Sequence, residues 1–120
     1  MIKYTKIATI LPYKENYTTS KAQAAALWVS EFYKFSKFKK NNFIYGSTDK
    51  KDYLTENYIN IPLKTLKSKF YSTTNEYCDE FLKINKNKNY DIIEIHNRPL
   101  VLKYLHKKTK SNFILYFHND

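Results

Sequence analysis

The 120-residue sequence predicts an α/β fold, with a doubly wound, mostly parallel Rossmann-like sheet that has helices on both faces. Short apolar runs alternate with longer amphipathic segments, in the order strand, helix, strand, strand, helix, strand, helix, strand. Because strand–helix–strand connections favour parallel neighbours, this order predicts a mostly parallel sheet. The length suits one domain, and no Gly/Ser-rich linker interrupts it.

The first half of the chain predicts three strands and one helix. Residues 6–11 (KIATIL) form an apolar run that ends at a proline, and residues 43–45 and 58–61 are shorter runs of the same kind. Ser20 with Gln23 matches a capping box, which predicts a helix over about residues 21–37. The apolar positions of this helix recur at helical spacing: Ala22, Ala25, Ala26, Val29, Phe32 and Tyr33.

The second half predicts two or three helices and two strands. Leu63, Leu66 and Phe70 have the spacing of a short helix, and Thr73 with Glu76 predicts a capping box. The helix behind it has an apolar face made of Tyr77, Cys78, Phe81, Leu82 and Ile84.

A strand over residues 90–95 ends at His96, and residues 112–117 form the last strand. Between these strands, Asn97 is a suitable N-cap and Pro99 suits the first turn of a helix. The buried face of that helix is expected to hold Val101, Leu102 and Leu105.

The net charge of +10 indicates an attraction to anionic partners. All of the 21 basic residues except Arg98 are lysines, and they are scattered along the chain. Base readout and bidentate phosphate binding favour arginine, so the composition disfavours a nucleic-acid partner. Anionic membrane surfaces and anionic small ligands stay open as partners.

The single cysteine and the absence of a long apolar run favour a cytoplasmic setting without disulfides. Cys78 lies on an apolar helix face, which favours a core residue over a reactive thiol. His106 precedes two lysines late in a helix, which favours a surface position. No metal-ligand spacing, glycine-rich phosphate loop or GxSxG motif is present, so we expect neither a metal nor a bound cofactor.

Polar residues follow three predicted strands, and the carboxyl ends of parallel strands share one edge of a sheet, where ligands bind. The candidate binding residues are Lys14, Glu15, Asn16 and Thr19 after the first strand, His96, Asn97 and Arg98 after the fourth, and His118, Asn119 and Asp120 after the last. Arginine and helix N-termini suit anionic groups, and His and Asn suit sugar hydroxyls.

Each of these residues also has a purely structural interpretation. Asn97 can serve only as a helix cap, and either histidine can be a hydrogen-bonded residue at the sheet edge without a ligand. Lys14 and Glu15 can belong to a solvated loop.

Four segments, read in order, resemble the N-terminal domain of GT-B glycosyltransferases, most closely family 4 (the glycosyl transferases group 1 type). They are KIATILP at 6–12, PYKENYTTSKA at 12–22, DIIEIHNRP at 91–99 and FILYFHND at 113–120. The HNRP tetrapeptide after a buried strand, with a later strand that ends in HND, is the most specific part. The resemblance covers the whole chain.

The resemblance implies transfer of a sugar from a nucleotide-sugar to a bacterial glycan or glycolipid acceptor, as in synthesis of cell-envelope polysaccharide. His118 matches the family's histidine that lies against the transferred sugar and is the implied catalytic residue. His96, Asn97 and Arg98 match the acceptor side, and the loop 13–20 matches the one that faces the donor phosphates. The nucleotide-sugar is a co-substrate, and no other cofactor is implied.

By this resemblance, residues 1–120 are a partial N-terminal Rossmann-like domain that lacks the C-terminal donor-binding domain. We therefore expect the isolated chain to be inactive, and to self-associate through an exposed sheet edge. Peripheral contact with the inner face of the membrane is a further option. The alternative function is a non-enzymatic basic α/β module that binds anionic lipid or nucleic acid. A flavodoxin-like or response-regulator-like domain ranks last, because the chain lacks the acidic cluster or flavin loop that these need.

Overall fold

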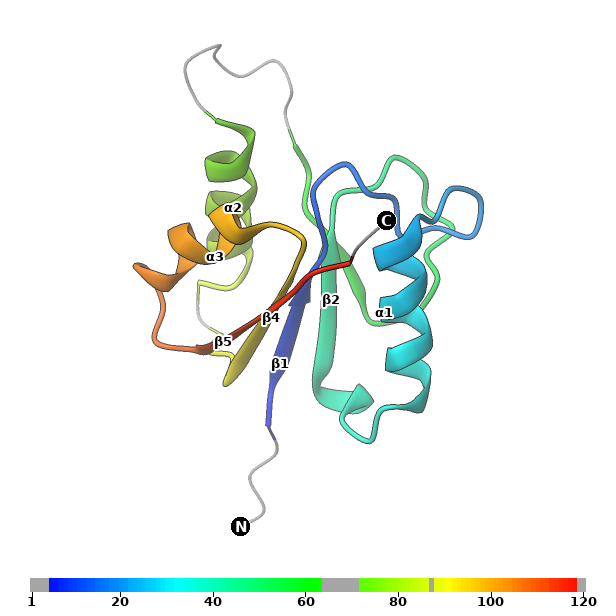
Figure 1. Cartoon of the computed structure of the whole chain (residues 1–120), viewed down its shortest axis with the longest axis horizontal. Helices are drawn as coiled ribbons and strands as arrows, with labels where there is room; N and C mark the ends of the chain where they lie inside the picture. Colours follow the sequence, from blue (N-terminus) through cyan, green and yellow to red (C-terminus); the bar gives the residue numbers. More distant parts are fainter. Residues whose placement is uncertain (1–4, 64–71, 87, 119–120) are drawn as a thin grey trace.

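The computed structural model describes residues 5–63, 72–86 and 88–118 and contains a five-stranded sheet whose strands are all parallel (Figure 1). The strand order is β3-β2-β1-β4-β5, a Rossmann-like arrangement. The strands are β1 (Ile7–Ile10), β2 (Asn42–Gly46), β3 (Tyr58–Asn60), β4 (Ile92–His96) and β5 (Asn112–Tyr116). The predicted α/β class and parallel sheet are therefore confirmed.

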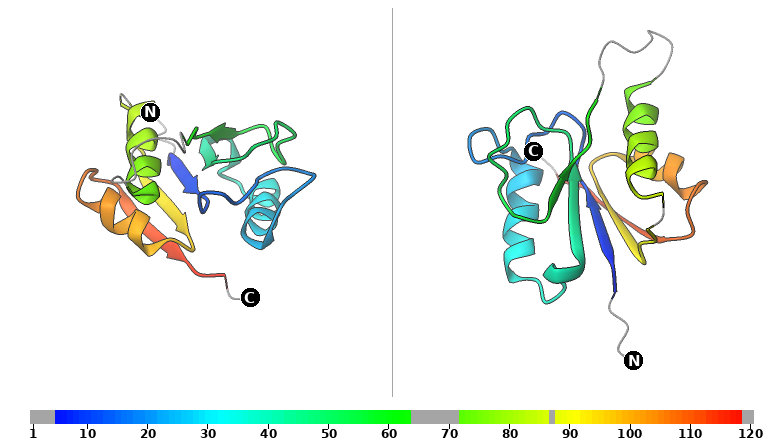
Figure 2. Two further views of the ribbon diagram at one scale, coloured as in Figure 1. Left: turned by 90° about the horizontal axis from the view of Figure 1, so that it is seen from above. Right: turned by 180° about the vertical axis from the view of Figure 1, so that it is seen from behind.

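Helices lie on both faces of the sheet (Figure 2). Helix α1 (Ala24–Phe35) covers one face, whereas α2 (Thr73–Ile84) and α3 (Pro99–His106) pack together on the other. A short 3₁₀ turn, η1 (Lys39–Asn41), precedes β2. Crossover connections between parallel strands are right-handed, and the strand order runs one way from β1 to β3 and the other way from β1 to β5. The two directions therefore place their helices on opposite faces.

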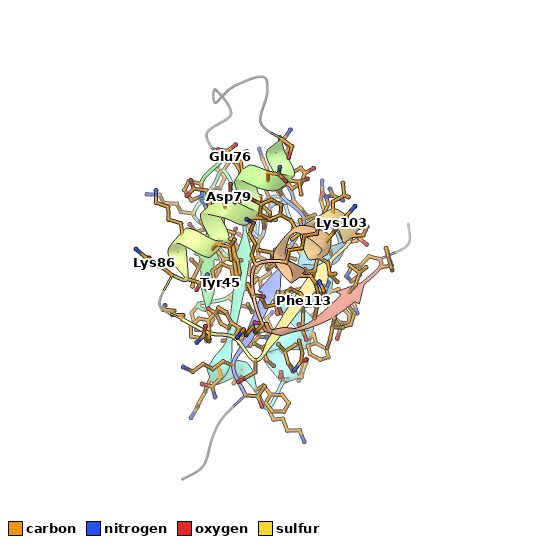
Figure 3. All side chains as sticks on the ribbon, turned by 90° about the vertical axis from the view of Figure 1, so that its left-hand side faces the viewer. Tyr45, Glu76, Asp79, Lys86, Lys103 and Phe113 are labelled. Atoms are coloured by element: carbon orange, nitrogen blue, oxygen red, sulfur yellow. The ribbon has the colours of Figure 1, made fainter. Side chains whose placement is uncertain are left out.

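Two clusters of buried side chains hold the layers together. The larger cluster lies between the sheet and α2/α3 and includes Tyr45, Phe81, Ile93 and Leu105. Figure 3 views this layer from the helix side, with the labelled Tyr45 and Phe113 on the strands behind the helices. The smaller cluster lies beneath α1, where it includes Tyr17, Val29 and Ile44 together with the small residues Ala25 and Ala26. These alanines allow the helix backbone to approach the sheet closely.

Cys78 is buried in the larger cluster, and burial raises the pKa of its thiol to about 12. The prediction of a core cysteine is confirmed, as is burial of Val101 and Leu105. Ile84, which was predicted for the same apolar face as Cys78, is instead 37% exposed at the end of α2. His106 is exposed, as predicted.

The predicted capping box at Ser20 and Gln23 is wrong. Helix α1 begins at Ala24, and its N-cap Gln23 makes no side-chain capping bond. The carboxylate of Glu15 caps the helix instead, because its Oε2 accepts a hydrogen bond from the Ala26 N–H at 2.6 Å. A free amide of the first turn is thus satisfied by the preceding loop.

The other helix starts differ from the predictions by one residue. Ser72, rather than Thr73, caps α2 and accepts from the Asn75 N–H at 3.0 Å. Arg98, rather than Asn97, is the N-cap of α3, and Pro99 occupies the first turn as predicted. The predicted short helix around Leu66 and Phe70 lies outside the described residues. Among the helices that the structure describes, none has the length and apolar character needed to cross a bilayer.

The capping by Glu15 yields a stability prediction. We expect Glu15→Ala to lower the free energy of unfolding by about 1 kcal/mol, because the Ala26 N–H loses its acceptor. Gln23→Ala is the matched control and should change it by less than about 0.5 kcal/mol, since its side chain makes no capping bond. Urea denaturation followed by circular dichroism measures both. A larger loss of stability for Gln23→Ala than for Glu15→Ala would contradict capping by Glu15 and favour the capping box at Ser20 and Gln23.

Candidate functional site

The carboxyl ends of β1, β4 and β5 meet at one edge of the sheet, beside the first turns of α1 (Figure 1). His96 is the last residue of β4 and pairs in register with Tyr116 of β5. His118 follows two residues after Tyr116. Parallel pairing therefore brings the two histidines to the same point of the edge.

The two histidine rings are in direct contact. Nδ1 of His96 lies 2.7 Å from Nε2 of His118, and the rings stack with centroids 5.0 Å apart. The His96 side chain is fully buried. Burial, assisted by the nearby His118, lowers the pKa of His96 to about 3. His96 is therefore a neutral imidazole at physiological pH, and one hydrogen is shared between the two facing nitrogens.

The surroundings of His96 favour one arrangement of that hydrogen. Nε2 of His96 is buried and has no hydrogen-bond partner among the described residues. A buried N–H without an acceptor is rarer than an acceptor that lacks a donor. The favoured tautomer therefore carries its hydrogen on Nδ1 and donates it to Nε2 of His118. The hydrogen of a neutral His118 then lies on Nδ1, which leaves this ring with a donor.

An aromatic wall surrounds the histidine pair. Tyr116 stacks on His96 with centroids 4.8 Å apart and ring planes 8° apart. Trp28 of α1 lies 5.6 Å from the His96 ring and 5.3 Å from the His118 ring, centroid to centroid. Trp28 is 40% exposed, so part of its ring faces solvent next to the pair. The site thus offers an apolar ring face beside polar nitrogen atoms.

Asn97 joins the ends of β4 and β5. Its Oδ1 accepts from the His118 N–H at 2.6 Å, and its own N–H donates to the Tyr116 carbonyl at 2.8 Å. Its φ of 56° lies in the left-handed region, which asparagine tolerates better than most residues. The predicted N-cap role is wrong because the side chain turns toward β5 and not toward the first turn of α3. Asn97 is a clamp that positions His118.

Arg98 and Glu15 complete the polar rim. The Arg98 guanidinium donates to the Asn97 carbonyl at 2.9 Å and lies 5.2 Å from the centre of the Tyr13 ring. Desolvation by burial raises the pKa of Glu15, while the bond from Ala26 and the nearby His118 and Arg98 oppose that rise. Glu15 therefore shares the electrostatic environment of the site with both basic residues.

The remaining candidates lie elsewhere or face solvent. Lys14 is exposed with a φ of 69°. Oδ1 of Asn16 accepts from the Asp49 N–H at 3.1 Å, and the Thr19 hydroxyl donates to Asp52 at 2.6 Å. These bonds tie the loop 13–20 to the loop 48–55 and occupy both side chains there. Asn119 and Asp120 lie outside the described residues.

Sequence reasoning missed Trp28 and Tyr116. Strand periodicity could have predicted Tyr116, because it stands two positions before His118 and alternate residues of a strand share a face. Trp28 carried no such signal, because the distance between α1 and the strand ends is not encoded in helical spacing.

Among the described residues, no three His, Cys, Asp or Glu side chains gather as a metal ion would require. Comparisons of the chain with protein-family models, with curated proteins and with solved structures found no significant match. A functional assignment therefore depends on the geometry of the strand-end site and on the residues themselves.

The low pKa of His96 predicts a pH dependence of stability. The unfolded chain binds a proton near the ordinary pKa of 6.5, and the folded chain binds it only near pH 3. The contribution of His96 to the free energy of unfolding is fully present above pH 6.5 and is lost as the pH falls toward 3. The loss is about 1.4 kcal/mol per pH unit.

The quantity to measure is the slope of the free energy of unfolding against pH, obtained by urea denaturation between about pH 4 and about pH 7. We expect His96→Phe to remove the contribution of His96 to this slope. Tyr116→Phe is the matched control, since it retains both histidines and the ring that stacks on His96. Equal slopes for the wild-type protein and His96→Phe would show that His96 binds its proton equally well in both states.

Proposed function

We propose that this chain supplies the acceptor side of a glycosyltransferase, which moves a sugar from a nucleotide-sugar to a bacterial glycan or glycolipid. In this proposal the chain corresponds to the N-terminal domain of the GT-B type, closest to family 4. His118 contacts the transferred sugar, and His96, Asn97 and Arg98 line the acceptor side. The observation that carries the proposal is the clamped His96–His118 pair at the carboxyl edge of a parallel sheet.

The chemistry of the site supports a sugar ligand. With its Nε2 occupied by His96, a neutral His118 presents an Nδ1–H donor, and sugar hydroxyls are good acceptors. The exposed part of Trp28 provides an apolar face next to this donor. Sugar rings have both hydroxyl groups and apolar C–H faces, so one ligand can use both features.

The polar rim supports the assignment of roles within the proposal. Glu15 already occupies an amide of the α1 N-terminus, where a ligand phosphate would otherwise bind. In this proposal, the main diphosphate contacts therefore come from groups other than this amide of the α1 N-terminus. Arg98, which lies at the polar rim of the site, is the cation proposed to face the leaving diphosphate.

The proposal is tested by NMR titration of the 120-residue chain with nucleotide-sugars and free sugars. We expect shifts at the Trp28 indole, Asn97 and His118, and a loss of about five- to tenfold in affinity for His118→Ala. His106→Ala, on the exposed face of α3, is the matched control and should bind as the wild type does.

The same preparations should show no sugar transfer and no hydrolysis of the donor on their own. Undiminished binding by His118→Ala, or ligand-induced shifts confined to residues away from the strand ends, would overturn the proposal. Turnover by the isolated chain would contradict its assignment as the acceptor half.

A further inference from the structure

Helix α1 has an outward face that is aromatic and exposed. Trp28, Phe32 and Phe35 recur at helical spacing, and Phe38 follows just beyond the helix. Phe32 is 50% exposed, Phe35 is 86% exposed and Phe38 is 45% exposed. The Trp28 and Phe32 rings stack with centroids 5.1 Å apart. Contiguous exposed apolar residues of this kind mark an interaction surface.

These aromatic residues line one open groove of about 500 Å³, together with Glu31, Ser36 and Lys37. We name Trp28, Phe32, Phe35, Lys37 and Phe38 the aromatic–lysine surface. It begins beside the histidine pair, where Trp28 contacts both rings, and continues along α1 to the segment before η1. It is therefore distinct from the strand-end site but adjoins it.

Lysines outnumber acidic residues around this surface. Lys34, Lys37, Lys39 and Lys40 lie within or just beyond the last turn of α1. Lys37 lines the groove with Glu31, whereas Lys39 and Lys40 line a separate pocket that also contains Glu56. Glu31 pairs with Lys34 at 3.7 Å. Within the described part of the chain, Lys37, Lys39 and Lys40 form no ion pair, so their charge is available to an anionic partner.

We propose that the aromatic–lysine surface binds the headgroup region of a bilayer that contains anionic lipids. Aromatic side chains concentrate at the boundary between headgroups and acyl chains, and lysines beside them are attracted to the negative surface. An exposed apolar helix face can bury itself at the boundary between headgroups and acyl chains, where binding increases with the apolar area and with attraction to anionic lipids. The surrounding lysines and the net charge of +10 favour this anionic surface over a second copy of the same cationic chain.

This inference stands independently of sugar transfer. If the proposed function also holds, membrane binding through α1 would keep the strand-end site beside the headgroups. That position would favour an acceptor carried on a lipid.

The sequence contains one tryptophan, Trp28, which makes a direct optical test possible. The chain is mixed with vesicles of phosphatidylcholine alone and with vesicles that also contain phosphatidylglycerol. We expect a blue shift of Trp28 emission, quenching by brominated acyl chains and co-sedimentation, all with the anionic vesicles. Added salt should weaken the binding, because it screens the lysine charges.

The double variant Phe35→Ser/Phe38→Ser should reduce vesicle affinity by about tenfold, because it removes two of the three exposed phenylalanines of the surface. Leu100→Ser is the matched control: Leu100 is 63% exposed, lies on α3 and should not affect binding. Since all three residues are exposed, we expect both variants to fold, and circular dichroism checks this.

Equal binding to both kinds of vesicle, or unchanged binding by the Phe35/Phe38 variant, would overturn the proposal. A blue shift that depends on protein concentration without vesicles, accompanied by dimers in sedimentation analysis, would assign the surface to a second copy and also overturn it.

Discussion

The parallel pairing of β1 with both β2 and β4 is the constraint on which the remaining structure depends. From this central strand the chain builds outward in two directions, and right-handed crossovers then require α1 on one face and α2 and α3 on the other. The same pairing aligns the carboxyl ends of β1, β4 and β5. The loop after β1, the histidine at the end of β4 and the histidine after β5 therefore meet although they are far apart in the chain.

The histidine pair shows how this alignment produces unusual chemistry. His96 is buried, so its neutral form is strongly favoured, and it can hold His118 through a single nitrogen. Asn97, whose own backbone is left-handed, accepts the backbone N–H of His118 and so restrains the same histidine from a second side. Several restraints thus converge on one partly exposed ring, and this convergence is the reason why we propose a ligand at this site.

The structure shows where part of the chain's positive charge lies. Much of it is distributed over the surface, but Lys37 lines the groove of the exposed aromatic residues, and three more lysines lie near it in the chain, at or just beyond the C-terminal end of α1. Trp28 belongs to both features, because one side of its ring contacts the histidines and another part is exposed. A ligand at the strand ends and a surface bound along α1 would therefore influence each other through this single side chain.

The sequence by itself determined the features that depend on residues near one another in the chain. Apolar runs and helical spacing predicted the element order, the parallel sheet, the buried face around Cys78 and the meeting of His96 with His118 at one edge. Tertiary structure decided the features that depend on distances between separate elements. Glu15 replaced Ser20 as the partner of α1 because a carboxylate eleven residues away reaches the Ala26 amide. Asn97 turned to β5 because the His118 amide lies within its reach, and Trp28 joined the site because α1 packs beside the strand ends. No local pattern records such distances, since they arise only when the layers pack against one another.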